Sequence, residues 1–319
     1  MARHVFKILK IFSFSKKAPF CFRFRLQDDG LKDSVERHGI LMPLLVTGGN
    51  QPVVIAGYKR LCAARALNLR ECPVLEIGKI NSRDAFLLNL ISNWRQGFSE
   101  MDRVKALSVA VRNLGMTVKD VQTQVMPLLG LPQDLGTLQV YLKADHFPVS
   151  LKNHFEEGLI SFRCAASLLK FSRASQEFFA KKIIGKIKLT SSQSVQTVEW
   201  LADLMKRTGK GLESLLAKQR ILKELNHTSM DPRTKADKFF EAVKRVRFPA
   251  YSAYRHEFQS RRIDIIQGTR NLRLEPIEGF EERGFELQTR IKSQEDLDAF
   301  LSQLSEKRPL LNSLFDVVL

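Results

Sequence analysis

The sequence has few cysteines, and none is placed where a metal site needs it. Its four cysteines, Cys21, Cys62, Cys72 and Cys164, form no C-x-x-C pair, and the six histidines do not cluster near them. Structural zinc sites use Cys and His ligands at short, fixed spacings. We therefore predict no metal site. Four scattered thiols in a long chain are typical of the reduced, buried cysteines of a cytoplasmic protein.

Long apolar runs are also missing. No stretch of the sequence approaches the roughly 20 apolar residues that a membrane-spanning helix needs. The first twenty residues are basic and apolar, like a signal peptide, but Lys7 and Lys10 interrupt the apolar run and no small-residue cleavage site follows. We therefore expect a cytoplasmic protein with no membrane partner.

Acidic residues are scarce relative to basic ones. The 319 residues include 34 Asp and Glu against 51 Lys and Arg, which gives a net charge of +17. Such an excess favours a polyanionic partner, either nucleic acid or an acidic membrane surface, although a generic basic protein is the alternative. All of the first seven charged residues are basic, so residues 1–24 are interpreted as a basic N-terminal arm, either in contact with phosphate or solvated.

The hydrophobic pattern divides the remaining chain into three parts. Residues 25–98 alternate helix and strand signals, as in a small α/β domain, and residues 99–228 have an all-helical pattern. Residues 229–319 begin with a basic helical stretch and continue with two strand signals on either side of Glu278-Gly279 and a helix at about 294–304. The predicted fold class is α+β, and the small α+β C-terminal domain is a candidate for dimerisation.

One strand-to-helix junction suits a phosphate group. An apolar strand ends at Gly57, and the helix that follows has Lys59 and Arg60 in its first turn. The unpaired N–H groups of a helix start attract anions, glycine lets the backbone approach closely, and arginine adds charge-assisted hydrogen bonds. On these residues alone, an ordinary turn with solvated basic side chains is the favoured interpretation, because one glycine and one arginine are weak evidence.

Two short helices in the second part are candidates for contact with DNA. Helices are predicted at 117–125 and 134–143, and the second should bury Leu135, Leu138 and Leu142. Such a pair resembles a helix-turn-helix, whose second helix enters the major groove, although a simple helical hairpin is commoner and the proline-rich turn is long. Gln and Thr can read base edges, and Lys can contact phosphate. The predicted DNA-binding residues are Lys119, Gln133, Thr137, Gln139 and Lys143.

The order of several short motifs resembles the N-terminal domain of the ParB family of chromosome- and plasmid-partition proteins. In that family a helix reading Ser-Ile-x-x-x-Gly is followed by a proline, a strand, a Gly-x-x-Arg box and then Glu-Asn-x-x-Arg. The matching letters here are Ser34-Val35, Gly39, Pro43, Gly57 to Arg60, and Ser92 to Gln96. Residues 147–165 are also similar to the segment after the family's helix-turn-helix. The resemblance covers about residues 25–175.

This resemblance implies a ParB/sulfiredoxin-like fold in which CTP and Mg²⁺ bind and close a clamp around DNA. By position, Gly57, Arg60 and Asn93 would face the triphosphate, with Lys59 beside them, and the Gly39 loop would face the base.

The sequence departs from the family's motifs at the metal end of this pocket. Ser92 stands where the family has its metal-binding glutamate, and Tyr58 stands where it often has another glutamate. Gln96 stands where the family has an arginine, and the adjacent Arg95 is a candidate to substitute for that arginine. A hydroxyl is a poor ligand for a hard metal ion beside a carboxylate. We therefore expect CTP binding that is weak or lost, and slow CTP hydrolysis at most.

We predict a DNA-binding homodimer for plasmid or chromosome partition, associated with the nucleoid and with a partition ATPase as partner. One alternative is a ParB-like transcription regulator without a nucleotide switch. Another is a nuclease or phosphotransferase of the same fold. The phosphotransferase needs a reactive cysteine, and Cys62, near Arg60, is predicted to lie on the apolar side of its helix. A metal nuclease needs clustered carboxylates, which are missing near Gly57.

Overall fold

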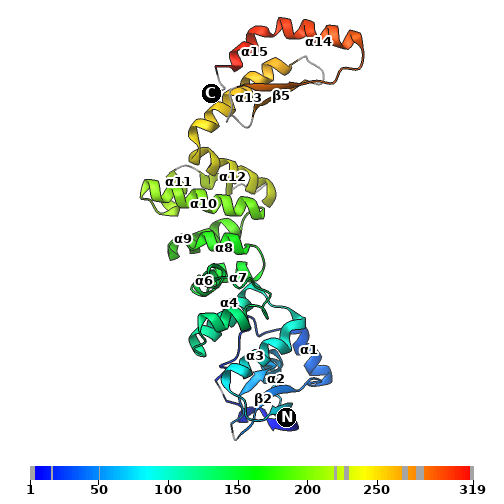
Figure 1. Ribbon diagram of the computed structural model, residues 1–319, viewed down its shortest axis with the longest axis vertical. Helices are drawn as coiled ribbons and strands as arrows, with labels where there is room; N and C mark the ends of the chain where they lie inside the picture. Colours follow the sequence, from blue (N-terminus) through cyan, green and yellow to red (C-terminus); the bar gives the residue numbers. More distant parts are fainter. Residues whose placement is uncertain are drawn as a thin grey trace. The chain divides into compact units, whose positions relative to one another are not determined.

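The computed structural model describes residues 4–15, 17–49, 51–218, 221–225, 230–267, 272–277 and 284–316. The chain divides into two compact units, Met1–Val198 and Glu199–Leu319. Figure 1 traces the elements in chain order, from a mixed sheet through a long helical stretch to a second, two-stranded sheet. The predicted α+β class is confirmed. The finer boundaries after residues 98 and 228 stay predictions.

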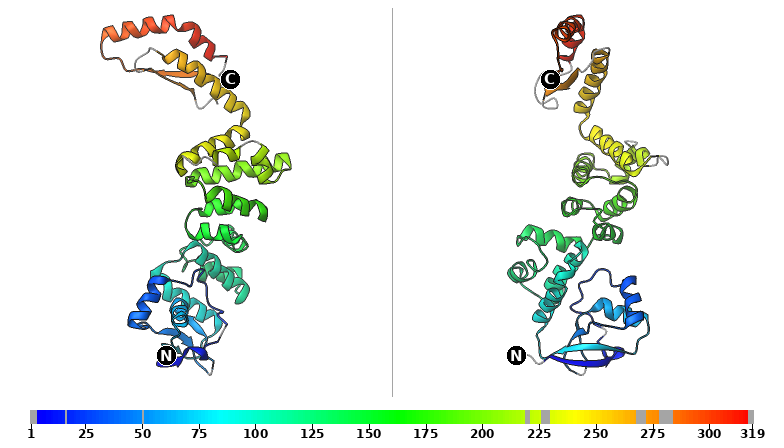
Figure 2. Two further views of the ribbon diagram at one scale, coloured as in Figure 1. Left: turned by 180° about the vertical axis from the view of Figure 1, so that it is seen from behind. Right: turned by 90° about the vertical axis from the view of Figure 1, so that its right-hand side faces the viewer.

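The sheet of the first unit has four strands in the order β1-β4-β2-β3. Their bounds are β1 His4–Lys10, β2 Leu44–Thr47, β3 Val54–Ala56 and β4 Glu71–Ile77. Strand β2 runs parallel to β4, and β2 with β3 and β1 with β4 are antiparallel. Leu44, Val46 and Val74 are fully buried, so the inner strands supply the core. The helices of this α/β region lie to one side of the sheet (Figure 2, right).

Strand β1 lies within the segment that was interpreted as a basic arm. Its seven residues pair with β4 from His4↔Ile77 to Lys10↔Glu71, and Lys7 Nζ forms an ion pair with Glu76 Oε2 at 2.6 Å. Basic side chains on a strand at the edge of a sheet discourage pairing with other chains. The segment's charge therefore coexists with a regular strand, which the sequence pattern had not indicated.

Helices α2 Tyr58–Ala66 and α3 Ser82–Asn93 pack against this sheet, and α1 Asp29–His38 packs against α2. The short turn η2 Trp94–Gln96 follows α3. The Asp28 carboxylate caps α1 by accepting from Leu31 N–H, and Gly39, at φ +70°, ends that helix. Gly57 begins α2 at φ +102°, and a Cβ atom there would lie 3.1 Å from both Leu44 and Arg60. Only glycine fits this junction without strain.

The rest of the first unit is helical. It contains α4 Glu100–Ser108, η3 Val109–Asn113, α5 Val118–Asp120, η4 Val121–Val125, α6 Leu135–Ala144, α7 Val149–Glu156, α8 Phe162–Leu168, α9 Arg173–Phe179 and η5 Ala180–Ile184, and α10 Ser191–Thr208 crosses the division between the units.

The two predicted helices of the pair form, as α5 with η4 and as α6. The burial predicted for α6 was partly wrong. Leu138 is buried and Leu142 is half-buried, but Leu135 is 48% exposed. Leu135 is the first residue of the helix, preceding the turn that brings Leu138 onto the core face.

The second unit combines helices with a two-stranded sheet. It contains α11 Leu212–Lys218, η6 Ile221–Leu225, α12 Pro232–Arg247, α13 Pro249–Ile266, β5 Arg273–Pro276, β6 Phe285–Gln288, α14 Gln294–Glu306 and α15 Arg308–Leu314. The two predicted strands pair antiparallel, while the predicted turn at Glu278-Gly279 lies outside the described residues. Phe258, Ile265, Leu274 and Leu314 form the core of the α13 region. Across the described residues, no helix has the length and apolar character required to cross a bilayer.

Candidate functional site

A cavity of about 450 Å³ opens beside the start of α2. Four of the six residues predicted to bind a nucleotide line it: Gly57, Lys59, Arg60 and Asn93. The other two, Gly39 and Arg95, are not among the lining residues, and the Arg95 side chain is exposed to solvent. The remaining lining residues are Phe22, Arg23, Asp28, Leu31, Met42, Tyr58, Asn89, Ser92 and Gln96. Segments far apart in the sequence therefore meet at the predicted phosphate junction.

Arg60 fixes the loop that borders the cavity. Its Nη1 donates to the carbonyl oxygen of Met42 at 2.5 Å and to that of Pro43 at 2.8 Å. Burial lowers the pKa of the guanidinium from its usual value. The side chain thus carries its charge to the first turn of α2, next to Gly57, and holds the 42–43 loop there by two charge-assisted hydrogen bonds.

Lys59 has an internal partner at the cavity rim. Its Nζ lies 3.1 Å from Asp28 Oδ2, and both side chains are part-exposed. The pKa of Asp28 is lowered, first by the hydrogen bond from Leu31 N–H and then by the one from Lys59. The carboxylate is therefore charged at neutral pH, and an anion that approaches Lys59 has to compete with it.

Arg23 is the central residue of the cavity wall, and the sequence analysis missed it. Its guanidinium donates to Asp102 Oδ2 at 2.5 Å, Asn93 Oδ1 at 3.0 Å and Gln96 Oε1 at 3.3 Å, and also to the Gly97 carbonyl. The Arg23 side chain is 12% exposed and that of Asp102 is 7% exposed. Because Asp102 lies in α4, this ion pair ties the cavity to the helical region.

Asn93 belongs to the same network. Its Nδ2 donates to the backbone oxygen of Asn89 at 2.8 Å and to Asn89 Oδ1 at 2.9 Å, while Ser92 Oγ donates to the Asn89 backbone oxygen at 2.8 Å. Asp28 is the one carboxylate that lines the cavity. Across the described part of the chain, no three His, Cys, Asp or Glu side chains gather as a metal site requires. The residues present fit a phosphate group better than a divalent metal ion.

The cysteines give no reactive thiol at the cavity. All four are free; Cys72 and Cys164 are buried, while Cys21 and Cys62 are half-buried, and none lines the cavity. Burial raises the pKa of Cys21, and it raises that of Cys72 to about 11. Thiols with raised pKa values hold little of the nucleophilic thiolate at neutral pH.

The helix pair presents most of the predicted DNA-binding residues to solvent. The side chains of Lys119, Gln133, Gln139 and Lys143 are exposed. Thr137 differs, because its backbone N–H and its hydroxyl both donate to the Asp134 carboxylate at 2.8 Å and cap α6. Its hydroxyl hydrogen is therefore already used, which leaves Thr137 less free than the other four to read a base edge.

Two exposed apolar residues of the pair had not been predicted as contacts. Val118 and Leu135 are each 48% exposed, at the start of α5 and of α6 respectively. Apolar side chains at such positions can contact the methyl group of thymine. Leu135 had been assigned to the packed face of its helix.

A buried carboxylate holds α6 in place. Asp145 is 12% exposed and receives a hydrogen bond from Ser108 Oγ at 2.9 Å, and its oxygens lie 3.1 to 3.6 Å from cationic groups of Lys105, Arg112 and Lys152. Burial acts to raise the pKa of Asp145, but the hydrogen bonds from Ser108 and Lys105 and the neighbouring charges outweigh it and lower the pKa. The ion pairs orient the exposed face of α6 relative to α4 and α7.

Comparison with known proteins gives a relative by sequence and neighbours by structure. The chain is 26% identical over 198 residues to Stage 0 sporulation protein J of Bacillus subtilis (strain 168), a ParB protein, and the match spans 61% of this chain and 66% of that protein. No protein-family model matches the chain.

Two solved structures similar to the chain are C-terminally truncated ParB proteins from Caulobacter crescentus. The complex with the centromeric parS site has 16% identity and a TM-score of 0.37, and covers 60% of this chain and 98% of that one. The complex with CTP-gamma-S has 17% identity and a TM-score of 0.25, and covers 56% of this chain and 99% of that one.

Proposed function

We propose that this chain is a partition protein of the ParB family that binds duplex DNA through α5, η4 and α6. The observation that carries the proposal is the exposed set Lys119, Gln133, Gln139 and Lys143 on a helix pair whose second helix is held by the Asp145 ion pairs. Lysines can contact phosphates, and glutamines can form two hydrogen bonds with adenine. The net charge of +17 favours the same partner.

The cavity beside α2 supports a degenerate nucleotide site in this proposal. Gly57, Lys59 and Arg60 at the helix start suit the phosphates of CTP. The metal end fits poorly, because Ser92 offers a hydroxyl and Asp28 is already engaged by Lys59. We expect CTP to bind weakly, with slow hydrolysis at most, and we assign no role to Mg²⁺.

The assembly in which this protein acts is part of the same proposal. A homodimer associated with the nucleoid, working with a partition ATPase, is the arrangement expected of a partition protein. The second unit supplies a candidate dimerisation element: α14 has no buried residue, and Leu297 and Leu301 are exposed on it. An apolar helix face of this kind favours contact with another helix.

The decisive experiment is selection of duplexes from a random library by the full-length protein, followed by titration at several salt concentrations. We expect an enriched sequence and an affinity that falls by about 10³- to 10⁵-fold between 50 and 200 mM salt, as for proteins that make six to ten phosphate contacts. Absence of any enriched sequence, or an affinity independent of salt, would contradict the proposal.

A further inference from the structure

Strand β1 is an edge strand with exposed apolar side chains. In the sheet as the structure describes it, β4 lies on one side of β1 and no strand lies on the other, so backbone N–H and C=O groups of alternate β1 residues point outward without a strand partner. Phe6 is 62% exposed and Ile8 is 65% exposed. A long, apolar edge of this kind is a template for pairing with another extended chain.

The same side chains begin an apolar surface that continues across the sheet. Residues in register on neighbouring strands share a face, as do alternate residues along a strand. Phe6 is in register with Leu75 of β4, which is in register with Leu45 of β2, and Ile8 is in register with Pro73. Leu45, Pro73 and Leu75 are half-buried. The helices of this region cover the other face of the sheet (Figure 2, right), which leaves the apolar surface uncovered.

A basic cavity of about 930 Å³ opens at the end of β1. Three cationic side chains line it, Lys10, Arg65 and Arg70, against one carboxylate, that of Glu71. Within the described part of the chain, none of the three cations forms an ion pair with an acidic side chain. Phe12, 82% exposed, also lines the cavity, and Lys10 Nζ lies 5.7 Å from the centre of its ring. An anionic ligand can therefore reach the cations without displacing a carboxylate.

The charge and the free strand edge together define the occupant that fits. A second copy of the chain would place its own basic β1 beside the first, and like charges on paired strands repel. Lipid would leave the outward backbone groups without hydrogen-bond partners, since open sheet edges do not enter hydrocarbon. A nucleic-acid strand matches the cations but not the apolar edge. An extended acidic peptide satisfies the backbone groups, the apolar surface and the cations.

We propose that β1 and the cavity at its end bind an extended segment of a partner protein, with alternating apolar residues and acidic side chains at one end. The segment adds to the sheet as the next strand beyond β1. Its apolar side chains lie on Phe6 and Ile8, and its carboxylates pair with Lys10, Arg65 and Arg70. This surface shares no residue with the candidate nucleotide cavity, and its occupation does not depend on DNA.

The test measures binding of a fluorescent peptide, Glu-Glu-Glu-Val-Thr-Val-Thr-Val, to the full-length protein by anisotropy. This order suits an antiparallel strand, and the reversed sequence suits a parallel one, because the acidic end must reach the cavity at the end of β1. Methylation of alternate backbone nitrogens removes main-chain donors and keeps every side chain and charge. We expect one order to bind, and its methylated form to bind about tenfold more weakly or less, since each lost backbone hydrogen bond costs severalfold.

Two double substitutions separate the ionic from the apolar contacts. Arg65→Gln/Arg70→Gln should weaken peptide binding by about tenfold, because each exposed ion pair contributes a severalfold effect at most. Phe6→Thr/Ile8→Thr keeps residues that favour strands but removes apolar contact area, and it should weaken binding by a similar factor.

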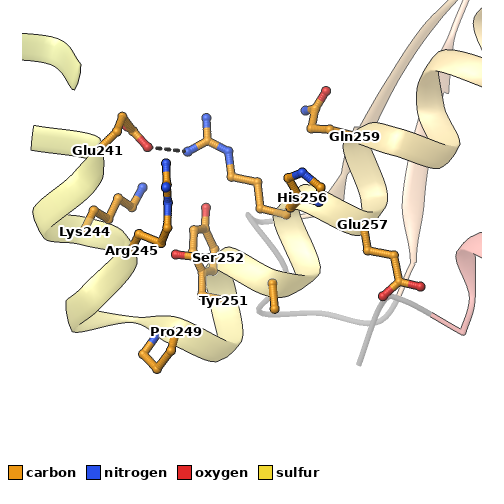
Figure 3. Close-up of a pocket in the computed structure, with 11 residues that line it drawn as sticks. Glu241, Lys244, Arg245, Pro249, Tyr251, Ser252, His256, Glu257 and Gln259 are labelled. Carbon is orange, nitrogen blue, oxygen red and sulfur yellow. Dashed lines mark hydrogen bonds and ion pairs between the residues drawn. The ribbon is translucent and has the colours of Figure 1, made fainter. Parts of the chain in front are cut away.

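The matched charge control uses a cavity of the second unit. That cavity, of about 900 Å³, lies where α12 ends and α13 begins at Pro249, and Figure 3 shows Lys244 and Arg245 on its α12 side. One of its cations, Arg255, is already paired with Glu241 at 3.3 Å (Figure 3). Lys244→Gln/Arg245→Gln removes two charges from a cavity of similar size and should leave peptide binding unchanged.

Each result supports or overturns the proposal. Absence of binding by both peptide orders, or equal binding of normal and methylated peptides to the wild type, would overturn it without use of any variant. An equal loss in Arg65→Gln/Arg70→Gln and in the control would overturn it as well. Without peptide binding, binding of single-stranded oligothymidine that depends on Arg65 and Arg70 would assign the cavity to nucleic acid, and binding of phosphatidylglycerol vesicles that depends on Phe6 and Ile8 would assign the edge to lipid. Unchanged thermal melting shows that each variant is folded.

Discussion

The candidate nucleotide pocket and the helix pair of the first unit differ in how their polar side chains are occupied. In the pocket, Arg23, Lys59 and Arg60 each contact an oxygen atom of the protein itself at 3.1 Å or less. On the helix pair, the side chains of Gln139 and Lys143 are exposed, and among the described residues they have no hydrogen-bond or ion-pair partner. The cationic side chains of the pocket thus already have hydrogen-bond partners within the protein, whereas Gln139 and Lys143 on the helix pair are available to a ligand.

This difference has an energetic consequence. A ligand in the pocket exchanges protein–protein hydrogen bonds for protein–ligand ones, so its net gain is small, about 1 kcal/mol for an ordinary hydrogen bond. DNA that meets the helix pair replaces only water and counterions, and the release of those ions favours binding. We therefore expect the pocket to modulate binding and the helix pair to supply affinity.

The largest expected effect comes from breaking the Arg23–Asp102 ion pair. Asp102→Asn keeps an oxygen for the Phe24 N–H but leaves the Arg23 guanidinium without its anion. The free energy of unfolding should fall by about 3 kcal/mol, as when one partner of a buried pair is removed. CTP affinity should rise, because Arg23 is released towards the pocket. Denaturant unfolding and calorimetric titration measure the two effects.

Glu157→Gln is the matched control for this substitution. Glu157 also loses its charge beside an arginine, Arg25, but both side chains are about half exposed. An exposed pair of this kind contributes about 0–1 kcal/mol. If Asp102→Asn were as stable as the control and bound CTP no better than the wild type, the pocket would not be restrained by Asp102.

The two regions also differ in how far the sequence could predict them. The helix pair was predicted because capping and hydrophobic spacing are local signals. The Thr117 side chain caps α5 by accepting a hydrogen bond from the backbone N–H three residues later, and the Asp134 side chain caps α6 in the same way. The Gly57 to Arg60 junction was predicted for the same reason. Leu135 was misassigned because the same local pattern does not reveal which turn of a helix is packed.

What the sequence could not reveal depends on contacts between distant residues. Arg23 and Asp102 are 79 positions apart, and nothing near either residue indicates the other. Strand β1 was missed because Lys7 and Lys10 interrupt its apolar residues and because its partner β4 is more than 60 residues away. The cavity between α12 and α13 likewise depends on the angle of the corner at Pro249, which a helical pattern does not define.

A smaller effect is expected from substitutions on the exposed face of the helix pair. Gln139→Ala should weaken binding to the selected duplex by about 1–3 kcal/mol and leave binding to a shuffled duplex unchanged, because a base contact carries sequence information. Lys143→Ala should weaken both equally and reduce the salt slope by about 0.9, the effect of one phosphate contact. Fluorescence anisotropy with both duplexes measures these differences.

Lys170→Ala provides the reference for general charge, because Lys170 is an exposed lysine of the same unit outside the helix pair. It should leave the affinity for the selected duplex close to that of the wild type. If Gln139→Ala and Lys143→Ala both behave like this control, α6 is not the helix that enters the major groove.

The smallest effect is expected where the pocket lacks a carboxylate. Ser92→Glu places one at the cavity edge, where Ser92 Oγ now donates to the Asn89 backbone oxygen, and it should produce a severalfold, Mg²⁺-dependent rise in CTP affinity. Ser92→Gln, of similar size but uncharged, should show no Mg²⁺ dependence. Arg60→Ala serves as the loss-of-binding reference for these two variants: it should abolish CTP binding, because it removes a cation and frees the 42–43 loop. Calorimetric titration of each variant with CTP and with the other three nucleotides, with and without Mg²⁺, measures these effects. Tight CTP binding with rapid turnover by the wild type, or an equal gain in Ser92→Gln, would show that the missing carboxylate does not limit the site.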